Sequence, residues 1–544
     1  MNRKLLYTIL MVGMLTLGFS VQAQGGIATP AGEFPIVTEP TVLRILISNG
    51  EQVADFNENS FTQWLEETTG LDLQIEVVNS TDAQTKLNLV LASGDLPDVL
   101  LGFPMTPSLL AQQGAEGTFV ALNDLMAEYG METKRVFEDE RPQLLPLNLS
   151  PDGNLYGLPE INECFHCFLS QKLWVYQPWL ETLGLEVPTT TEEFEQMLIA
   201  FKEQDPNGNG IADEVPFSGN VEGQGGWHNS VDQNLMNAFL FYDRIQHDRL
   251  LLIDGKVEAA YAQPGYREGL RYLNGLYEQG LIDPNGLIQD NQALLQLGSQ
   301  TEPHLLGAVS GGWMGTYTIP QTLEQGGEMD NWIAIPPLQG PEGVQTAAYA
   351  PWGFSVGRCV VTSAAANPDV AFRFCDLLYS AEATMRNVFG VEGTDWITPP
   401  EGEESIDGGQ AAYRTMANWG EGQTTTHWRQ TGMTYRTSEF RLSQSAVDQF
   451  VEVPLFIASN DMLPYAPPLE ELIPPLSFDD AVSGQLTEAQ LSVKTYIDEM
   501  LVRFITGDAD IETEWDSYLE TLNSQGLPSL LEIYQAAYDA QVAS

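Results

Sequence analysis

Positive charge is scarce in this 544-residue sequence. It holds 23 lysines and arginines against 75 aspartates and glutamates, which gives a formal net charge of −52 at pH 7. Nucleic acid is therefore not an expected partner, because contacts with phosphates need a positive field. Histidine is also rare, and none of the five forms the H-E-x-x-H pattern of a metalloprotease. We predict that the protein is not an enzyme and has no catalytic residues.

Long apolar runs are absent beyond the first residues of the chain. Residues 1–23 have the pattern of a secretory signal, with Arg3 and Lys4 before an apolar run and the small-x-small site Val21-Gln22-Ala23 at its end. No later stretch reaches the roughly 18 apolar residues that a membrane helix needs. No cysteine stands at the cleavage site to carry a lipid anchor. We expect an exported, soluble, periplasmic or extracellular protein.

Cysteine occurs only four times, and export permits these residues to form disulfides. Cys164 and Cys167 lie in a segment that reads as extended, where three strand steps span about 10 Å. They can pair only if the chain turns there. A bond between Cys359 and Cys375, which would join a strand to the next helix, meets no such obstacle. A metal site on Cys164-Phe165-His166-Cys167 is an alternative, although one C-x-x-C without a second pair is a weak signal.

Apolar residues are plentiful, at 43% of the chain, enough for two or more domains with full-sized cores. After a Gly/Ala/Pro-rich leader over residues 24–40, which we expect to be flexible, strands alternate with amphipathic helices. This alternation predicts an α/β fold with a parallel sheet. The predicted order is strand 41–47, helix 61–70, strand 73–78, helix 82–92 and strand 98–101.

Residues 205–214, with the sequence DPNGNGIADE, have the pattern of a loop that wraps a hard cation. Oxygen-bearing side chains alternate along it, a glycine permits a sharp turn, and Ca²⁺ is the cation that this pattern suits. The alternative is a polar turn without a metal. The loop occurs once and its last acid comes two positions earlier than in an EF-hand, which favours a structural clamp over a sensor. The predicted ligands are Asp205, Asn207, Asn209, the carbonyl of Ile211, Asp213 and Glu214.

A helix is predicted directly before this loop. Residues 190–193 (TTEE) form a capping box, and the apolar residues Phe194, Met197, Leu198 and Phe201 follow at helical spacing. The cation would therefore tie down the carboxyl end of the helix over 191–203, where the helix dipole also favours positive charge.

Several motifs stand in order along the chain: ASGDLPDV at 92–99, LNDL at 122–125, LYGLP at 155–159, WLETLGLEVPTT at 179–190, FGVEGTDW at 389–396 and the C-terminal segments 504–507, 515–519 and 526–539. Together they resemble the motifs of family 1 extracellular solute-binding proteins, the capture subunits of ABC importers. The cation loop follows one of them in the same frame as in the alginate- and oligosaccharide-binding subgroup. The resemblance covers nearly the whole mature chain, although Phe389 replaces a tyrosine of the subgroup pattern.

The resemblance implies a two-lobe, type II periplasmic-binding-protein-like α/β fold, with a ligand cleft between the lobes and crossover strands as the hinge. It implies that the first lobe comprises 41–157 and about 338–400, and the second 158–337 and about 401–544. The implied activity is capture of a solute, most of all an oligosaccharide, by lobe closure. The implied partners are that ligand and a membrane permease of an ABC importer, with the protein itself a monomer that holds one structural Ca²⁺.

Loop aromatics are the candidate ligand contacts, because a flat ring matches the C–H face of a sugar. The resemblance singles out Trp313, which follows a strand and lies among glycines. Trp227, Tyr349, Trp352 and Trp396 are further candidates, and core packing is the alternative for each.

Three other functions compete with oligosaccharide capture. The first is a secreted, Ca²⁺-dependent glycoside hydrolase, because 75 acids offer many possible carboxylate pairs. The second is a binding protein for a peptide or a polyuronate. The third is a calcium-dependent interaction module of the dockerin kind, which the single loop disfavours.

Overall fold

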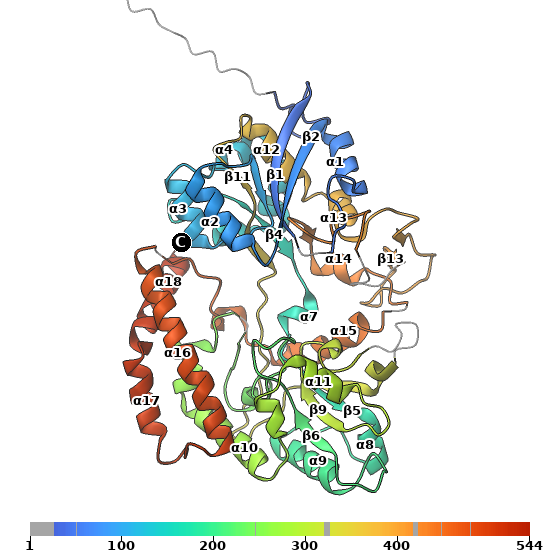
Figure 1. The fold of residues 1–544 in the computed structure, drawn as a ribbon, viewed down its shortest axis with the longest axis vertical. Helices are drawn as coiled ribbons and strands as arrows, with labels where there is room; N and C mark the ends of the chain where they lie inside the picture. Colours follow the sequence, from blue (N-terminus) through green and yellow to red (C-terminus); the bar gives the residue numbers. More distant parts are fainter. Residues whose placement is uncertain are drawn as a thin grey trace, which may run out of the picture.

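The computed structural model describes residues 27–49, 52–244, 246–319, 327–416, 423–447, 449–478 and 480–543. The predicted signal segment and the first three residues of the leader lie outside these ranges. Two lobes lie one above the other in Figure 1, each built around a sheet. Within the described residues, no helix combines the length and the apolar character needed to cross a bilayer.

The strands alternate with helices through most of the chain. The strands are β1 (Thr41–Asn49), β2 (Leu71–Asn79), β3 (Val99–Leu101), β4 (Leu158–Asn162), β5 (Leu173–Tyr176), β6 (Val215–Ser218), β7 (Leu250–Ile253), β8 (Lys256–Ala259), β9 (Leu306–Ser310), β10 (Trp332–Ile335), β11 (Phe354–Val361), β12 (Trp396–Ile397), β13 (Arg414–Thr415) and β14 (Tyr435–Arg436).

The α-helices are α1 (Ser60–Thr69), α2 (Ala83–Ser93), α3 (Pro107–Ala115), α4 (Asn123–Tyr129), α5 (Glu132–Lys134), α6 (Leu144–Asn148), α7 (Phe165–Phe168), α8 (Gln177–Leu183), α9 (Thr191–Glu203), α10 (Pro264–Glu278), α11 (Asn291–Gly298), α12 (Pro368–Leu377), α13 (Ala381–Phe389), α14 (Ser438–Leu442), α15 (Glu452–Met462), α16 (Asp480–Thr506), α17 (Trp515–Ser524) and α18 (Leu527–Ala543). Short 3₁₀ turns include Met314–Thr316, and Arg135–Glu140 form a π-helical segment.

The first lobe is built on a six-stranded sheet in the order β14-β4-β11-β3-β1-β2. Its strands run parallel except β11, which is antiparallel to both neighbours. The sheet has two apolar faces because successive side chains point to opposite sides. Ile45 and Ile47 lie in a core that α1 and α12 cover, whereas Leu46 and its β3 partner Leu100 lie in a core that α2 and α3 cover. The α/β prediction is confirmed.

The second lobe is built on a four-stranded sheet in the order β10-β5-β9-β6. Its core contains Trp174 of β5, Trp179 of α8, and Phe194 and Phe201 of α9. The helix α9 has the predicted bounds, and its capping box is complete, because Thr190 and Glu193 each bond the other's backbone N–H. The C-terminal helices α16, α17 and α18 complete this core and lie along one side of the lobe in Figure 1.

The leader is packed against the first lobe from residue 27 onward, so the prediction of a flexible leader is wrong for its described part. Ile36 and Val37 are buried in the first-lobe core. The guanidinium of Arg373 donates to the carbonyls of Thr29, at 2.6 Å, and Glu33, at 2.8 Å. Apolar burial and these charge-assisted bonds outweigh the flexibility that the Gly/Ala/Pro composition indicates.

The predicted division of the chain between the lobes is wrong in two places. Residues 158–162 form β4 of the first sheet, not the start of the second lobe. The segment from about 401 to 447, assigned to the second lobe, contributes β14 to the first sheet and Trp428 to the first core. The Trp428 indole packs on Phe61 and donates a hydrogen bond to Thr62 Oγ1 at 2.9 Å. Residues from Leu455 onward pack in the second core.

The chain passes between the two sheets at three places in the described residues. The first crossing, residues 163–172, runs from β4 through α7 into β5 and lies at the waist in Figure 1. The second joins β10 to β11, and the third joins β14 to α15. Neither lobe is therefore a continuous piece of the chain.

Candidate functional site

The carboxyl ends of strands from both sheets point toward the first crossing. β4 ends at Asn162 and leads straight into α7, and β1 and β3, which run parallel to it, end at the same edge. After α7 the chain enters β5 at Leu173, which pairs with Ser310 at the end of β9. In open α/β sheets, ligands bind outside the carboxyl ends of the strands. The space around α7 is therefore the candidate ligand site.

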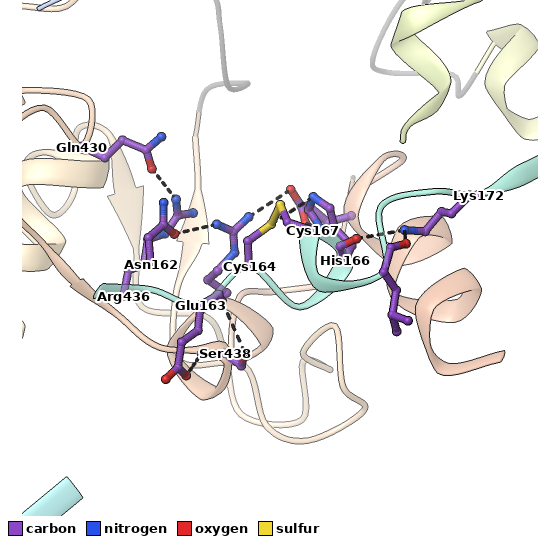
Figure 2. The surroundings of a disulfide bond; sticks show 12 residues. Asn162, Glu163, Cys164, His166, Cys167, Lys172, Gln430, Arg436 and Ser438 are labelled. Atoms are coloured by element: carbon purple, nitrogen blue, oxygen red, sulfur yellow. Dashed lines mark hydrogen bonds and ion pairs between the residues drawn. A yellow bond between two sulfur atoms is a disulfide. The ribbon is translucent and has the colours of Figure 1, made fainter. Parts of the chain in front are cut away.

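Four polar side chains connect the lobes here, and we name Asn162, His166, Arg441 and Glu452 the waist cluster. His166 Nδ1 of α7 lies 3.1 Å from Glu452 Oε2 of α15. Arg441 lies 3.9 Å from the other Glu452 oxygen and donates to Asn162 Oδ1 at 3.1 Å. Figure 2 shows Asn162 and Arg436 to one side of the Cys164–Cys167 disulfide and Lys172 to the other.

Burial and hydrogen bonding set the charges of the waist cluster. Burial acts to raise the pKa of Glu452, but the hydrogen bond from His166 and the nearby cationic groups outweigh it and lower that pKa to about 2. Burial lowers the pKa of His166 below its ordinary value, against the opposing effect of Glu452. At neutral pH the pair is therefore a neutral imidazole that donates its Nδ1–H to a carboxylate.

Lys172 is a buried cation at the end of the same crossing. Its ammonium donates to the carbonyls of His166, at 2.9 Å, and Leu169, at 2.5 Å. Burial lowers the pKa of Lys172 to about 7. The lysine thus holds the carboxyl end of α7 through two backbone oxygens, at a cost in desolvation.

Trp227 and Trp313, two of the predicted ligand contacts, lie close together beside α7. The Gly312 N–H donates to the Trp227 carbonyl at 2.7 Å, and a Cβ at Gly312 would come within 2.2 Å of the Trp227 ring. The Trp313 ring folds over Gly315 in the same way. The His166 and Trp227 rings are nearly perpendicular, with 6.3 Å between ring centroids. Both indoles are half-buried, whereas Trp174 and Trp179 are fully buried in the core.

The other three predicted aromatics lie elsewhere. Tyr349 and Trp352 are half-buried on the second crossing. This crossing is joined to α7 by a hydrogen bond of 2.9 Å from the Ala350 N–H to the Phe168 carbonyl. Trp396 lies in β12 of the C-terminal part of the first lobe and donates to the Gly390 carbonyl at 3.2 Å. It packs against a separate small core.

Both possible cysteine pairs are disulfides. Cys164 and Cys167 are 5.1 Å apart at Cα because the chain turns through α7, so the interpretation of this segment as extended is wrong. Within the described residues, Cys164, His166 and Cys167 are the one group of three or more His, Cys, Asp and Glu residues whose ligand atoms all lie within 4.8 Å of one another. Its sulfurs are bonded to each other, which excludes the thiolate metal site. Cys359 of β11 is bonded to Cys375 of α12, as the sequence favoured.

The predicted cation loop joins the end of α9 to β6, and its side-chain oxygens accept hydrogen bonds from its own backbone and amide groups. Asp205, Gly208 and Gly210 have positive φ. The Asp205 carboxylate accepts from the N–H groups of Asn209, at 3.1 Å, and Gly210, at 3.0 Å. The Asn209 side-chain oxygen accepts from the Ile211 N–H at 2.6 Å. The Ile211 side chain points to solvent, whereas its carbonyl accepts from the Asp213 N–H.

Glu214 is the residue that fits a cation best. Both of its carboxylate oxygens are buried without a hydrogen-bond partner. Burial, followed by the charges of Asp205 and Asp213, raises the pKa of Glu214 above its ordinary value. Buried carboxylate oxygens among other acids need a positive charge. The oxygen-only donor set of this loop fits Ca²⁺.

Sequence reasoning did not find the waist cluster or Lys172. His166 and Glu452 are 286 positions apart, and neither lies in a motif that indicates a partner. The sequence placed the boundary between the lobes at 157/158, before the observed crossing at 163–172, so it gave no signal for these residues.

Residues 49–385 match the model of the bacterial extracellular solute-binding protein family. This is more than half of the chain, so the chain belongs to that family, which is non-catalytic. Both the resemblance and the prediction that the protein is not an enzyme are confirmed.

Two curated relatives match along most of their length. The chain is 27% identical over 526 residues to the fructooligosaccharide ABC transporter substrate-binding protein FusA of Streptococcus pneumoniae serotype 4, covering 94% of this chain and 92% of that protein. It is 21% identical over 485 residues to lipoprotein LipO of Bacillus subtilis, covering 87% and 88%.

Solved structures are similar over nearly the whole chain. FusA in complex with kestose has a TM-score of 0.72 at 25% identity and covers 92% of this chain and 99% of its own. An extracellular solute-binding protein from Bifidobacterium longum subsp. infantis has a TM-score of 0.78 at 21% identity, with 92% and 98% covered. The alginate-binding protein AlgQ2 without calcium ion has a TM-score of 0.62 at 21% identity, with 92% and 99% covered. The last two show the fold alone.

Proposed function

We propose that this protein is the solute-binding subunit of an ABC importer, which captures an oligosaccharide by lobe closure and delivers it to a membrane permease. The observation that carries the proposal is the meeting of both sheets' carboxyl ends at α7, with the half-buried rings of Trp227 and Trp313 beside it. The relationship to FusA, named for fructooligosaccharides and similar along 94% of this chain, supports the same ligand class.

Trp227 and Trp313 would supply the apolar contacts to the sugar, because the faces of indole rings match the C–H faces of pyranose and furanose rings. Asn162 of the first lobe and His166 of the crossing would supply polar contacts. A ligand that contacts both lobes binds the closed arrangement more tightly than the open one, and this difference in affinity is what drives closure. Tyr349 and Trp352 would extend the site along the second crossing.

The pairing of charges favours a neutral sugar over a polyuronate. Arg441 is paired with Glu452, and Arg358 lies 3.5 Å from the buried Glu160. An acidic ligand would have to compete with these carboxylates for the guanidinium groups, whereas a neutral sugar would not. The net charge of −52 also disfavours anionic ligands.

We further propose that residues 205–214 bind one structural Ca²⁺. Asp205, Asn207, Asn209, the Ile211 carbonyl, Asp213 and Glu214 would hold the ion. The unpartnered oxygens of Glu214 support this, because a bound cation would compensate their burial. The ion would stabilise the connection between α9 and β6 inside the second lobe.

Calorimetric titration of the mature chain with kestose, a trigalacturonate and a tripeptide tests the proposed ligand class. We expect saturable binding of kestose and none of the other two. Binding of the tripeptide alone would refute the oligosaccharide assignment, and binding of trigalacturonate alone would refute the preference for a neutral sugar. Chromatography of the kestose mixture after prolonged incubation should recover the trisaccharide intact, and steady release of smaller sugars would instead support the hydrolase alternative.

A further inference from the structure

The two disulfides differ in where they lie and how exposed they are. Cys359 and Cys375 are fully buried in the first-lobe core, inside one lobe. Cys164 and Cys167 lie in the first crossing between the lobes, and Cys167 is half-buried. A thiol reagent reaches a disulfide only where a sulfur is accessible, so the Cys164–Cys167 disulfide is the one open to exchange.

The short helix α7 depends on its surroundings. A helix of four residues cannot sustain itself, because forming the first turn is unfavourable in isolation. The Cys167 N–H donates to the Cys164 carbonyl at 2.8 Å, and the disulfide closes the same turn covalently. Beyond it, Lys172 holds the His166 and Leu169 carbonyls. The disulfide is the only covalent constraint within this crossing.

We propose that the Cys164–Cys167 pair is a thiol–disulfide exchange site, open to a dithiol, whose redox state sets the stiffness of the crossing and so the affinity for the ligand. The affinity part rests on the proposed function as a binding protein that closes around its ligand. The exchange site itself does not.

The exchange is a two-electron reduction by a dithiol. A thiolate of the reagent attacks Cys167 Sγ, the Sγ–Sγ bond breaks, and Cys164 leaves as a thiolate. The second thiol of the reagent then attacks the first sulfur of the reagent, which is bonded to Cys167 Sγ in the mixed disulfide. Cys167 is released as a thiolate, and the reagent becomes a cyclic disulfide. The two thiol protons of the reagent end on Cys164 and Cys167.

His166 is placed to accommodate the reduced form. Its Nε2 lies 3.4 Å from Cys164 Sγ, and its Nδ1–H is directed to Glu452. The lone pair on Nε2 can therefore accept a hydrogen bond from the Cys164 thiol after reduction. Reduction exchanges a covalent clamp for one weak hydrogen bond, which leaves α7 held by non-covalent contacts alone and so less rigid.

A looser crossing weakens ligand binding because closure must then order more of the chain. We expect the Kd for kestose to rise roughly three- to tenfold on reduction. The two lobe cores should be unaffected, since the second disulfide stays closed.

Mass spectrometry after a short, limited treatment of the full mature chain with dithiothreitol, followed by alkylation, tests the selectivity. We expect labels on Cys164 and Cys167 while the Cys359–Cys375 bond stays intact. Labelling of all four cysteines in parallel, or of Cys359 and Cys375 first, would overturn the proposal.

Amide hydrogen exchange on the same samples, without ligand, tests the stiffness of residues 163–172 directly. We expect faster exchange there after reduction, and the C164S/C167S variant to show it without reductant. C359A/C375A is the matched control, expected to lower Tm without changing exchange in 163–172. An unchanged rate of amide hydrogen exchange in residues 163–172 on reduction would overturn the proposal, whether or not kestose binds.

Kestose titration of the oxidised and reduced chains completes the test. We expect the Kd of the wild-type chain to rise on reduction, whereas reductant should leave the Kd of C164S/C167S unchanged. Equal Kd values for the oxidised and reduced wild-type chains would overturn the link to affinity. Failure of kestose to bind either form would instead count against the proposed ligand class. The hydrogen-exchange result would still test the proposed exchange site, because that measurement is made without ligand. Selectively reduced wild-type chain replaces the double variant if that variant does not fold.

Discussion

His166 Nδ1 lies 3.1 Å from Glu452 Oε2, which joins α7 of the first crossing to α15 of the second-lobe core. The two residues are 286 positions apart in the sequence. Through Arg441 the same carboxylate is connected to Asn162 at the end of β4. A single acid thus holds together the end of a first-lobe strand, the crossing and a second-lobe helix.

Removal of that acid should destabilise the protein. Glu452→Ala leaves the buried His166 N–H without its acceptor, and we expect a loss of about 1–2 kcal/mol in the free energy of unfolding. Glu452→Gln keeps an acceptor oxygen and should lose less. Urea unfolding at pH 7 measures both, with the exposed Glu470→Ala as the control. Equal stability of Glu452→Ala and Glu470→Ala would contradict the role assigned to the pair.

Truncation of the paired indoles should weaken ligand binding more than it weakens the fold. We expect Trp227→Ala and Trp313→Ala each to reduce affinity for kestose at least tenfold, the size of effect typical of a buried aromatic contact of about 2 kcal/mol. Trp64→Ala is the control, because this half-buried ring stacks on Phe61 in α1. Titration calorimetry decides, and comparable losses in all three variants would argue against the site.

A smaller change tests how Trp227 is positioned. A methyl group at Gly312 would come within 2.2 Å of the Trp227 ring, so Gly312→Ala must displace the indole. We expect a loss of kestose affinity close to that of Trp227→Ala, with the far-UV circular dichroism unchanged. Wild-type affinity in Gly312→Ala would show that the position of this ring does not matter for binding.

The loop at 205–214 should respond to chelation. We expect EDTA to lower the Tm of the wild-type protein by a few degrees and Asp205→Ala to remove that response while kestose preference stays unchanged. Asp254→Ala is a matched control, since Asp254 is an exposed aspartate with a similar positive φ, 49° against 47°, in the β7–β8 turn. If EDTA abolished kestose binding without lowering Tm, the cation would belong to the ligand site.

Lys172 should make stability depend on pH above neutrality. Burial lowers its pKa from 10.5 to about 7, so between these values the unfolded chain binds a proton that the folded chain has released. Stability relative to Lys172→Met should therefore rise with pH, by roughly 2–4 kcal/mol from pH 7 to pH 10. Urea titrations across this range measure the difference. A constant difference between wild type and Lys172→Met would contradict the buried charge.

Local patterns in the sequence predicted local structure well. The capping box at Thr190 and the apolar spacing after it gave the bounds of α9, because helix initiation and one-face burial are decided within a few residues. The loop after α9 has the predicted sharp turn at Gly210 for the same reason, and Gly208 adds a second positive φ that was not predicted. Its cation stays a prediction, in keeping with the buried carboxylate oxygens of Glu214.

Contacts between distant segments could not be predicted. β14 is two residues long and exists only because β4, more than 270 positions earlier, offers it a partner, so no periodicity marks it. Cys164 and Cys167 pair because α7 turns, and that turn depends on Lys172 and Glu452 rather than on helix propensity. The burial of Ile36 and Val37 likewise depends on a core assembled from later segments.

The division of each lobe between separate parts of the chain has a consequence for biosynthesis. As the polypeptide leaves the ribosome, the four strands of the second sheet are available once Ile335 has been made. β4 must wait, because its neighbours β11 and β14 are translated later and end at Arg436. Its unpaired edges would meanwhile be open to wrong pairing. Translation should therefore allow the second sheet to form before the first, whereas the second-lobe core is completed only when α16, α17 and α18 have been made.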